Sequence, residues 1–137
     1  MKTAHAVPRP LRLAPGSDLR ERIEQLTREA GITGAFVVCG IGSLSRTAIR
    51  FAGATQAEVH EVDVEIVSLA GSVSPDGAHL HAALADASGR VFGGHVAHGC
   101  TVRTTAEILI VELLGWTFSR QHDSVTGYPE LVIERRA

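Results

Sequence analysis

One amphipathic helix near the start of the chain, followed by segments that favour strands, constrains the fold more than any other feature. In residues 16–32, Asp18 can cap a helix, and Glu21 three residues later completes a capping box. Gly31 is placed to end this helix. Between these ends a single apolar stripe repeats at helical spacing, at Leu19, Ile23, Leu26 and Ala30.

The remainder of the chain predicts strands. Residues 34–40 are a continuous apolar run, which is typical of a strand buried on both faces. Prolines restrict residues 5–13 to an edge strand at most, because proline cannot donate to a sheet ladder. The alternation in residues 59–74 slips between His60 and Val62, which indicates a bulge. Further strands are predicted at residues 47–53, 101–113, 116–120 and 130–134, the last two as short closing strands.

This order of elements predicts an α+β fold, in which one principal helix packs on a mostly antiparallel β-sheet. The chain has 137 residues, enough for one hydrophobic core and too few for two. We therefore expect residues 1–137 to form a single domain.

Charge and composition exclude several classes of protein. Thirteen basic and fifteen acidic residues give a formal charge of −2, whereas a duplex-DNA binder usually carries a basic patch, so direct DNA binding is not expected. The apolar run at residues 108–116 contains Glu112 and is shorter than the ~20 residues of a membrane span. No secretion signal opens the chain, so a cytoplasmic location is expected. The cysteines, Cys39 and Cys100, are predicted to be buried free thiols.

Three histidines, His79, His81 and His95, are the main candidates for chemistry. His79 and His81 are two residues apart, so in a strand they project from the same face. Gly93 and Gly94 weaken a strand unless something must approach closely, such as a ligand or another chain. Three neutral imidazoles with an open fourth position suit zinc, and such sites usually catalyse or bind ligands. Ordinary half-buried strand histidines are the alternative interpretation.

The turn before His95 decides which histidine joins His79 and His81. A three-residue loop that ends at Gly89 places His81 directly opposite His95. A two-residue loop would turn His95 to the other face and bring His98 opposite His79. The longer loop is favoured, because its last position needs a positive φ and glycine stands there.

Two other segments hold candidate ligand-binding residues. Residues 39–43 follow a strand and are interpreted as a sharp loop that brings backbone N–H groups to a pocket edge. In residues 101–107, Arg103 could bind a carboxylate through two hydrogen bonds, and Glu107 could orient a histidine or move protons. A solvated strand face or an Arg–Glu pair is the alternative. The candidates are Gly40, Gly42, Ser43, Arg103, Thr105 and Glu107.

Several blocks, taken in order, resemble the plant-and-prokaryote conserved (PPC) domain, and together they cover nearly the whole chain. The resemblance implies a largely antiparallel sheet and assembly as a homotrimer. Plant members accompany AT-hooks, but this sequence has no Arg-Gly-Arg-Pro hook; prokaryotic members usually stand alone and are often described as candidate DNA-binding proteins. The blocks are GSDLRERIEQL (16–26), VVCGIGSLSRTAIRF (37–51), EIVSLAGSVS (65–74), HLHAALADASGRVFGGHV (79–96) and VRTTAEILIVEL (102–113).

The His-x-His…His pattern is also similar to the zinc site of acetolactate decarboxylases, which implies His79, His81 and His95 as the ligands. These resemblances predict a stand-alone trimeric PPC-domain protein that binds a divalent metal, zinc, and a small anionic ligand near Arg103 and residues 39–43. A metal-dependent lyase or hydrolase that acts on a small carboxylate is the alternative. A transcription-associated module that acts through a trimer or a partner is a third hypothesis.

Overall fold

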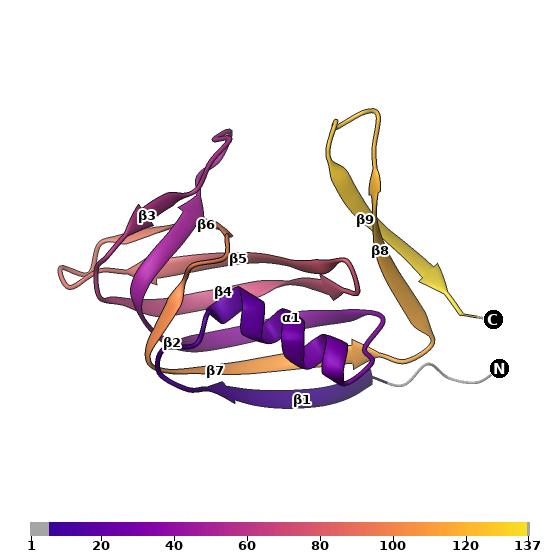
Figure 1. Ribbon diagram of the computed structural model, residues 1–137, viewed down its shortest axis with the longest axis horizontal. Helices are drawn as coiled ribbons and strands as arrows, with labels where there is room; N and C mark the ends of the chain where they lie inside the picture. Colours follow the sequence, from indigo (N-terminus) through magenta and orange to yellow (C-terminus); the bar gives the residue numbers. More distant parts are fainter. Residues whose placement is uncertain (1–5, 137) are drawn as a thin grey trace.

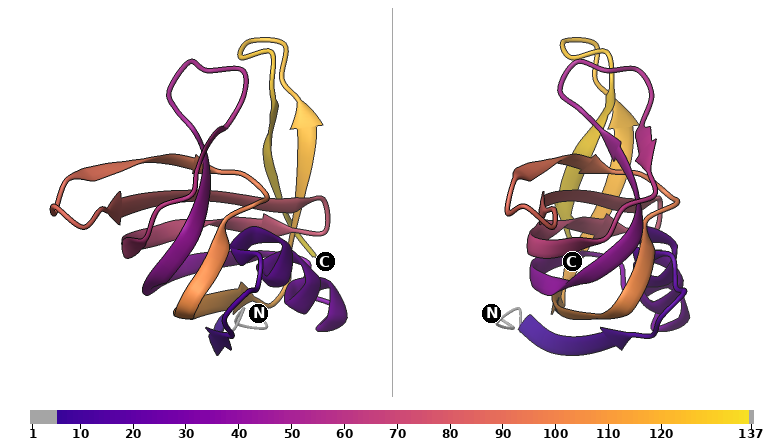
Figure 2. Two further views of the ribbon diagram at one scale, coloured as in Figure 1. Left: turned by 60° about the vertical axis from the view of Figure 1, so that its left-hand side comes forward. Right: turned by 90° about the vertical axis from the view of Figure 1, so that its left-hand side faces the viewer.

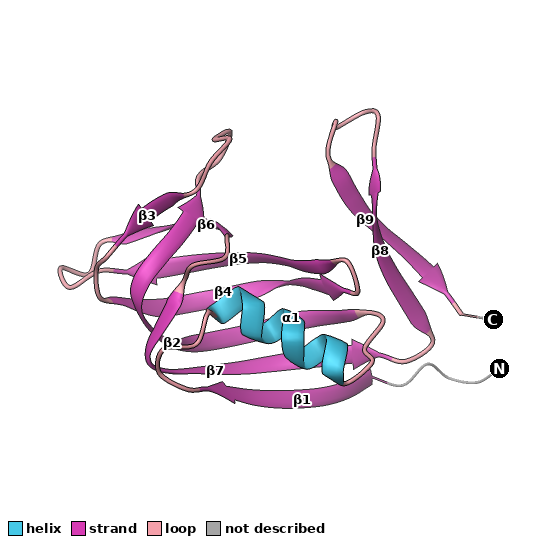
Figure 3. Cartoon of the chain, viewed as in Figure 1, coloured by secondary structure: helices cyan, strands magenta, loops and turns pink. Residues whose placement is uncertain are grey.

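The structure, a computed structural model, describes residues 6–136 and contains, within them, nine strands and one helix (Figures 1 and 3). This composition confirms the predicted α+β fold with a mostly antiparallel sheet. No helix among the described residues is both long and apolar enough to cross a membrane. The elements are β1 Ala6–Leu13, α1 Leu19–Glu29, β2 Ala35–Arg50, β3 Glu58–His60, β4 Val64–Ser74, β5 Gly77–Ala85, β6 Val91–Val96, β7 Thr101–Leu113, β8 Trp116–His122 and β9 Pro129–Arg135.

The main sheet is antiparallel and curls on itself. Its strand order is β1-β7-β2-β4-β5-β6, and β3 pairs with β2. The long strand β2 pairs with β4 from Ala35 to Leu44, and its last residues, Ile49 and Arg50, pair with β6. The sheet therefore bends until β6 meets the end of β2, as the turned views of Figure 2 show. This bend brings β5, β6 and the end of β2 together.

The predicted helix is confirmed and packs on one face of the main sheet, against β4, β5 and β7 (Figure 1). Asp18 accepts a 2.9 Å hydrogen bond from the Glu21 backbone N–H, as an N-cap does. Leu19 and Ile23 are buried in the core as predicted. The stripe is wrong at Ala30, which is exposed because it caps the helix end. The polar residue Glu24 is buried instead, for reasons that involve the candidate site.

Two strands predicted separately, residues 34–40 and 47–53, belong to one continuous strand, β2. The predicted loop at residues 39–43 is therefore wrong. The strand continues because three register shifts against β7 accommodate its irregular stretch. Glycine in this stretch marks close backbone approach rather than a turn: a Cβ at Gly42 would lie 2.2 Å from the Thr105 carbonyl oxygen.

The single strand predicted for residues 59–74 is also wrong, because the chain leaves the sheet between β3 and β4. Residues 61–63 are exposed there, and Glu61 and Asp63 form ion pairs with Arg46 and Arg103. The predicted bulge at 60–62 is replaced by this excursion, and the register shift of the segment lies later, between Ile66 and Ser68 in the β4–β5 pairing.

The strands predicted near the end of the chain are confirmed as β8 and β9, but they do not close the main sheet. They form a two-stranded sheet of their own, which projects from the body of the molecule (Figure 1, orange to yellow). Phe118 anchors this hairpin, because its ring is 1% exposed and contacts Phe36 edge to face. Residues of this hairpin and of the end of β2 line one cleft beside the candidate site.

Within residues 6–136 the first strand, β1, pairs only with β7, and it lies at the edge of the sheet as predicted. His5, the first residue of the predicted segment, lies outside the described residues. Both cysteines are free thiols, but only Cys100 is buried. Cys39 is exposed, contrary to the prediction, because the register shift after Val37 leaves consecutive residues of β2 on the outside.

Candidate metal centre

The hairpin that joins β5 and β6 positions the three candidate histidines. Gly89 has a φ of 79°, and the Asp86 N–H donates to the Arg90 carbonyl at 2.9 Å, which closes a three-residue loop. His81 is consequently paired directly with His95 across the two strands. The register predicted from the turn is confirmed.

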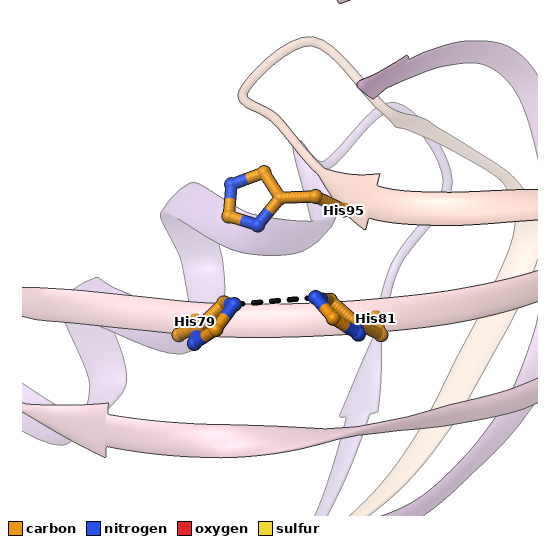
Figure 4. Close-up of side chains that lie close together, drawn as sticks. All are labelled: His79, His81 and His95. Atoms are coloured by element: carbon orange, nitrogen blue, oxygen red, sulfur yellow. Dashed lines mark hydrogen bonds between the residues drawn. The ribbon is translucent and has the colours of Figure 1, made fainter. Parts of the chain in front are cut away.

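The three imidazoles converge on a small volume, with one nitrogen of each within 4.8 Å of the others. His79 and His81 extend from β5 and His95 faces them from β6 (Figure 4). The Nε2 atoms of His79 and His81 lie 3.2 Å apart, joined by the dashed line in Figure 4. A tetrahedral zinc ion with Zn–N bonds of 2.0–2.1 Å places its ligand nitrogens about 3.3 Å apart. The donor set therefore fits a divalent metal such as zinc, and the spacing between His79 and His81 matches that of two ligands of one ion.

The surroundings of His79 and His95 favour the neutral imidazole, the form that binds metals. Partial burial, followed by the charge of Arg50, lowers the pKa of His95 to about 4. Burial and the nearby Arg120 guanidinium also lower the pKa of His79. The Nδ1 atom of His95 is buried without a hydrogen-bond partner among residues 6–136. A buried nitrogen without a partner is unusual in a folded protein and is consistent with an atom that has another role.

His98, the alternative third ligand, does not join the cluster. Its Nε2 lies 2.8 Å from a carboxylate oxygen of Glu24 on α1. The other oxygen of Glu24 accepts hydrogen bonds of 2.9 Å from Arg20 Nε and from the backbone N–H of Ala78. Glu24 thus links the helix to the residue directly before His79, a connection that the sequence pattern did not reveal.

A cleft of about 790 Å³ opens beside the cluster, between the curled sheet, α1 and the β8–β9 hairpin. Its volume suits a small-molecule ligand. Three arginines line this cleft, and none of them was a predicted site residue. The helical spacing of Arg20 and Glu24, four residues apart, is the one sequence pattern that indicates a contact of these arginines. The lining residues are Arg20, Arg50, Gly53, Asp76, Gly77, Ala78, His79, His95, Arg120, Tyr128, Pro129 and Glu130.

The predicted ligand-binding residues outside the histidine cluster lie elsewhere in the chain's fold. Arg103 pairs with Asp63 at 3.2 Å and lines a different cleft of about 300 Å³. Ser43 is buried in a 2.7 Å hydrogen bond with the Thr104 hydroxyl. Within one chain, neither residue lines the cleft beside the histidines. The same is true of the other predicted ligand-binding residues on β2 and β7, which are Gly40, Gly42, Thr105 and Glu107. Their role in ligand binding stays a prediction.

The order of the strands and the histidine hairpin agree with a known family. The sequence model of the Plants and Prokaryotes Conserved (PCC) domain matches residues 6–114. The chain belongs to this family. The match includes the helix, the whole main sheet and all three candidate ligands.

Solved structures share the fold of this PCC domain. A hypothetical protein from Salmonella enterica is 37% identical, covers 99% of both chains and has a TM-score of 0.94. A metal-containing protein from Archaeoglobus fulgidus is 27% identical and has a TM-score of 0.75, covering 96% of this chain and 99% of its own. A candidate DNA-binding protein from Ralstonia eutropha JMP134 is 25% identical with a TM-score of 0.75, covering 91% of this chain and 89% of its own.

Curated relatives carry the PCC-like segment within much longer chains. The bifunctional protein GlmU of Synechococcus sp. strain JA-3-3Ab is 47% identical over 128 residues, which are 93% of this chain and 21% of that protein. The chain therefore spans about a fifth of the length of this relative. The similarity to acetolactate decarboxylases stays a similarity of the histidine motif.

Proposed function

We propose that this PCC domain binds one divalent metal ion, zinc, through His79, His81 and His95, and presents it to a small ligand in the adjoining cleft. The convergence of three imidazole nitrogens within 4.8 Å carries the proposal. The metal-containing relative from Archaeoglobus fulgidus supports it. When bound, such an ion is a Lewis acid with a position open to ligand or water.

The protein's own residues would prepare this site in two ways. The β5–β6 hairpin holds His81 and His95 opposite each other before any ion arrives. The Ala78 N–H is fixed by Glu24, which constrains the backbone next to His79. Ligands that are already positioned lose little conformational entropy when the ion binds.

Metal analysis of untagged protein tests the proposal. We expect about one zinc ion per chain in the wild type, and almost none in a triple variant with His79→Ala, His81→Ala and His95→Ala. His122→Ala, on the exposed end of β8, is the matched control and should keep the wild-type content. A chelator should lower the melting temperature of the wild type, because an ion bound only by the folded state stabilises it.

The triple variant must remain folded for the comparison to count, which circular dichroism checks. Wild-type zinc content in a folded triple variant would contradict the proposal. A melting temperature that responds to zinc equally in both proteins would contradict it as well.

One further assignment, assembly as a homotrimer, belongs with the proposal. The PCC resemblance and the exposed apolar side chains of Val38, Ile41 and Val67 on the main sheet support a homotrimer. The candidate DNA-binding role is a role of relatives such as the Ralstonia protein. With a formal charge of −2, direct binding to duplex DNA is not part of the proposed function. The lyase or hydrolase alternative stays a prediction, because no reaction follows from the cleft alone.

A further inference from the structure

Two arginines contact or adjoin His95 from different elements. Arg20, on α1, places Nη1 at 3.5 Å from His95 Nε2 and donates to the Val96 carbonyl at 3.2 Å. Arg50, at the end of β2, is paired directly with His95. Side chains of directly paired residues project from the same face of a sheet, so Arg50 extends beside the imidazole.

A third arginine approaches from the β8–β9 hairpin. Arg120 Nη2 donates a 2.8 Å hydrogen bond to the Ser72 hydroxyl, and Ser72 is paired with His79 across β4 and β5. The Arg120 backbone N–H donates at 2.8 Å to Asp76, which fixes the hairpin against the β4–β5 turn. Arg120 and Arg50 therefore adjoin different histidines of the cluster.

The three arginines differ in whether a carboxylate neutralises their positive charge. Arg20 pairs with Glu24 at 2.9 Å. Among residues 6–136, neither Arg50 nor Arg120 forms an ion pair with a carboxylate, although Asp76 and Glu130 also line the cleft. A guanidinium group does not lose its proton in proteins. Two permanent positive charges thus face the cleft without a carboxylate partner, next to His79 and His95.

We infer that the cleft binds a small dianion through Arg50 and Arg120, with its carboxylate or phosphate oxygens next to the histidine cluster. Guanidinium groups bind such oxygens through charge-assisted, often paired, hydrogen bonds. Two arginines beside different histidines can each hold one anionic group, which favours dianions over monoanions. The inference deepens the proposed function and rests on it for one contact only, that of the dianion with a bound metal ion.

Calorimetric titration with malonate, inorganic phosphate and acetate tests this inference, on zinc-loaded and on metal-free protein. Malonate or phosphate should bind the wild type about tenfold more tightly than acetate, and Arg50→Gln or Arg120→Gln should weaken that binding about tenfold each. The preferred dianion distinguishes a carboxylate from a phosphate ligand. Arg12→Gln, an exposed arginine on β1, is the control and should bind as the wild type does.

The outcomes separate this inference from the metal proposal. Unchanged dianion binding in both glutamine variants, or no binding of any probe to zinc-loaded wild type, overturns the inference. If zinc does not bind but malonate binds metal-free protein in an Arg50-dependent way, the metal proposal fails and the inference stands. Should a glutamine variant unfold, Arg50→Lys and Arg120→Lys take its place in the titration. These variants keep the positive charge, so their affinity for the dianion should fall by less than the tenfold expected of the glutamine variants.

Discussion

Glu24 is the residue that connects the helix to the candidate metal centre. Its side chain accepts hydrogen bonds from Arg20 and the Ala78 N–H and lies 2.8 Å from His98 Nε2. Ala78 directly precedes His79, and Arg20 contacts His95. A single buried carboxylate thus fixes groups next to two of the three candidate ligands.

The ionised form of Glu24 is the form that these contacts stabilise. Burial alone would raise the pKa of its carboxyl, but the hydrogen bonds from Ala78, His98 and Arg20 outweigh burial and lower the pKa. A pKa that is lower in the folded than in the unfolded state stabilises the fold at neutral pH. That stabilisation is lost as the pH falls through the folded-state pKa.

Glu24→Gln should lower the free energy of unfolding by about 2 kcal/mol at pH 7, because hydrogen bonds to a charged group are replaced by bonds to a neutral amide. The difference from the wild type should shrink in acid, once the wild-type carboxyl is itself protonated. Urea unfolding at several pH values measures this. Glu134→Gln, exposed on β9, serves as the control. A difference that stays constant down to pH 3 would speak against the assigned role of the charge.

At the scale of elements, the two strands of the β5–β6 hairpin lie so close together that no side chain fits at Gly93. A Cβ added at Gly93 would lie 2.0 Å from the Ala82 carbonyl oxygen on β5. The close approach predicted at this glycine is confirmed, but it is made by strand β5 of the same chain and not by a ligand or another chain. In contrast, a Cβ at Gly89 in the turn would meet nothing within 4 Å, although its φ is 79°.

Gly93→Ala should therefore separate β5 from β6, destabilise the protein by about 1–3 kcal/mol and reduce its zinc content. Gly89→Ala should cost about 1–2 kcal/mol through backbone strain alone and leave the zinc content of folded protein unchanged. Thermal unfolding and metal analysis of both variants provide the comparison. Full zinc content in Gly93→Ala would show that the strand spacing does not hold the histidines together.

The same hairpin shows what the sequence can predict. Loop length, turn residue and strand alternation are local, so the pairing of His81 with His95 followed from the residues between them. The long strand β2 was missed, because its glycines meet neighbours that are distant in the sequence. The bond between Glu24 and Ala78 and the bond between Arg120 and Ser72 were missed for a similar reason: each joins two different elements, and helical or strand periodicity carries no information about such contacts.

At the scale of the whole molecule, the single helix covers only one face of the main sheet (Figure 1). Apolar side chains of neighbouring strands β2 and β4 are exposed: Val38 at 54%, Ile41 at 56% and Val67 at 54%. We call these three residues the apolar strip. Apolar side chains clustered on an uncovered sheet face commonly mark a protein contact, and we propose that this chain forms a trimer in which the strip is buried between subunits.

Sedimentation velocity tests this assembly. The wild type should sediment at about three times the 14.5 kDa chain mass, and Ile41→Glu or Val67→Glu should shift the equilibrium toward monomer, because a charge buried in an apolar contact is costly to desolvate. Val91→Glu, which changes a residue 58% exposed on β6, is the matched control and should leave the mass unchanged. A wild type that sediments at 14.5 kDa contradicts the trimer. Glutamate variants that remain trimeric would instead place the subunit contact away from the strip.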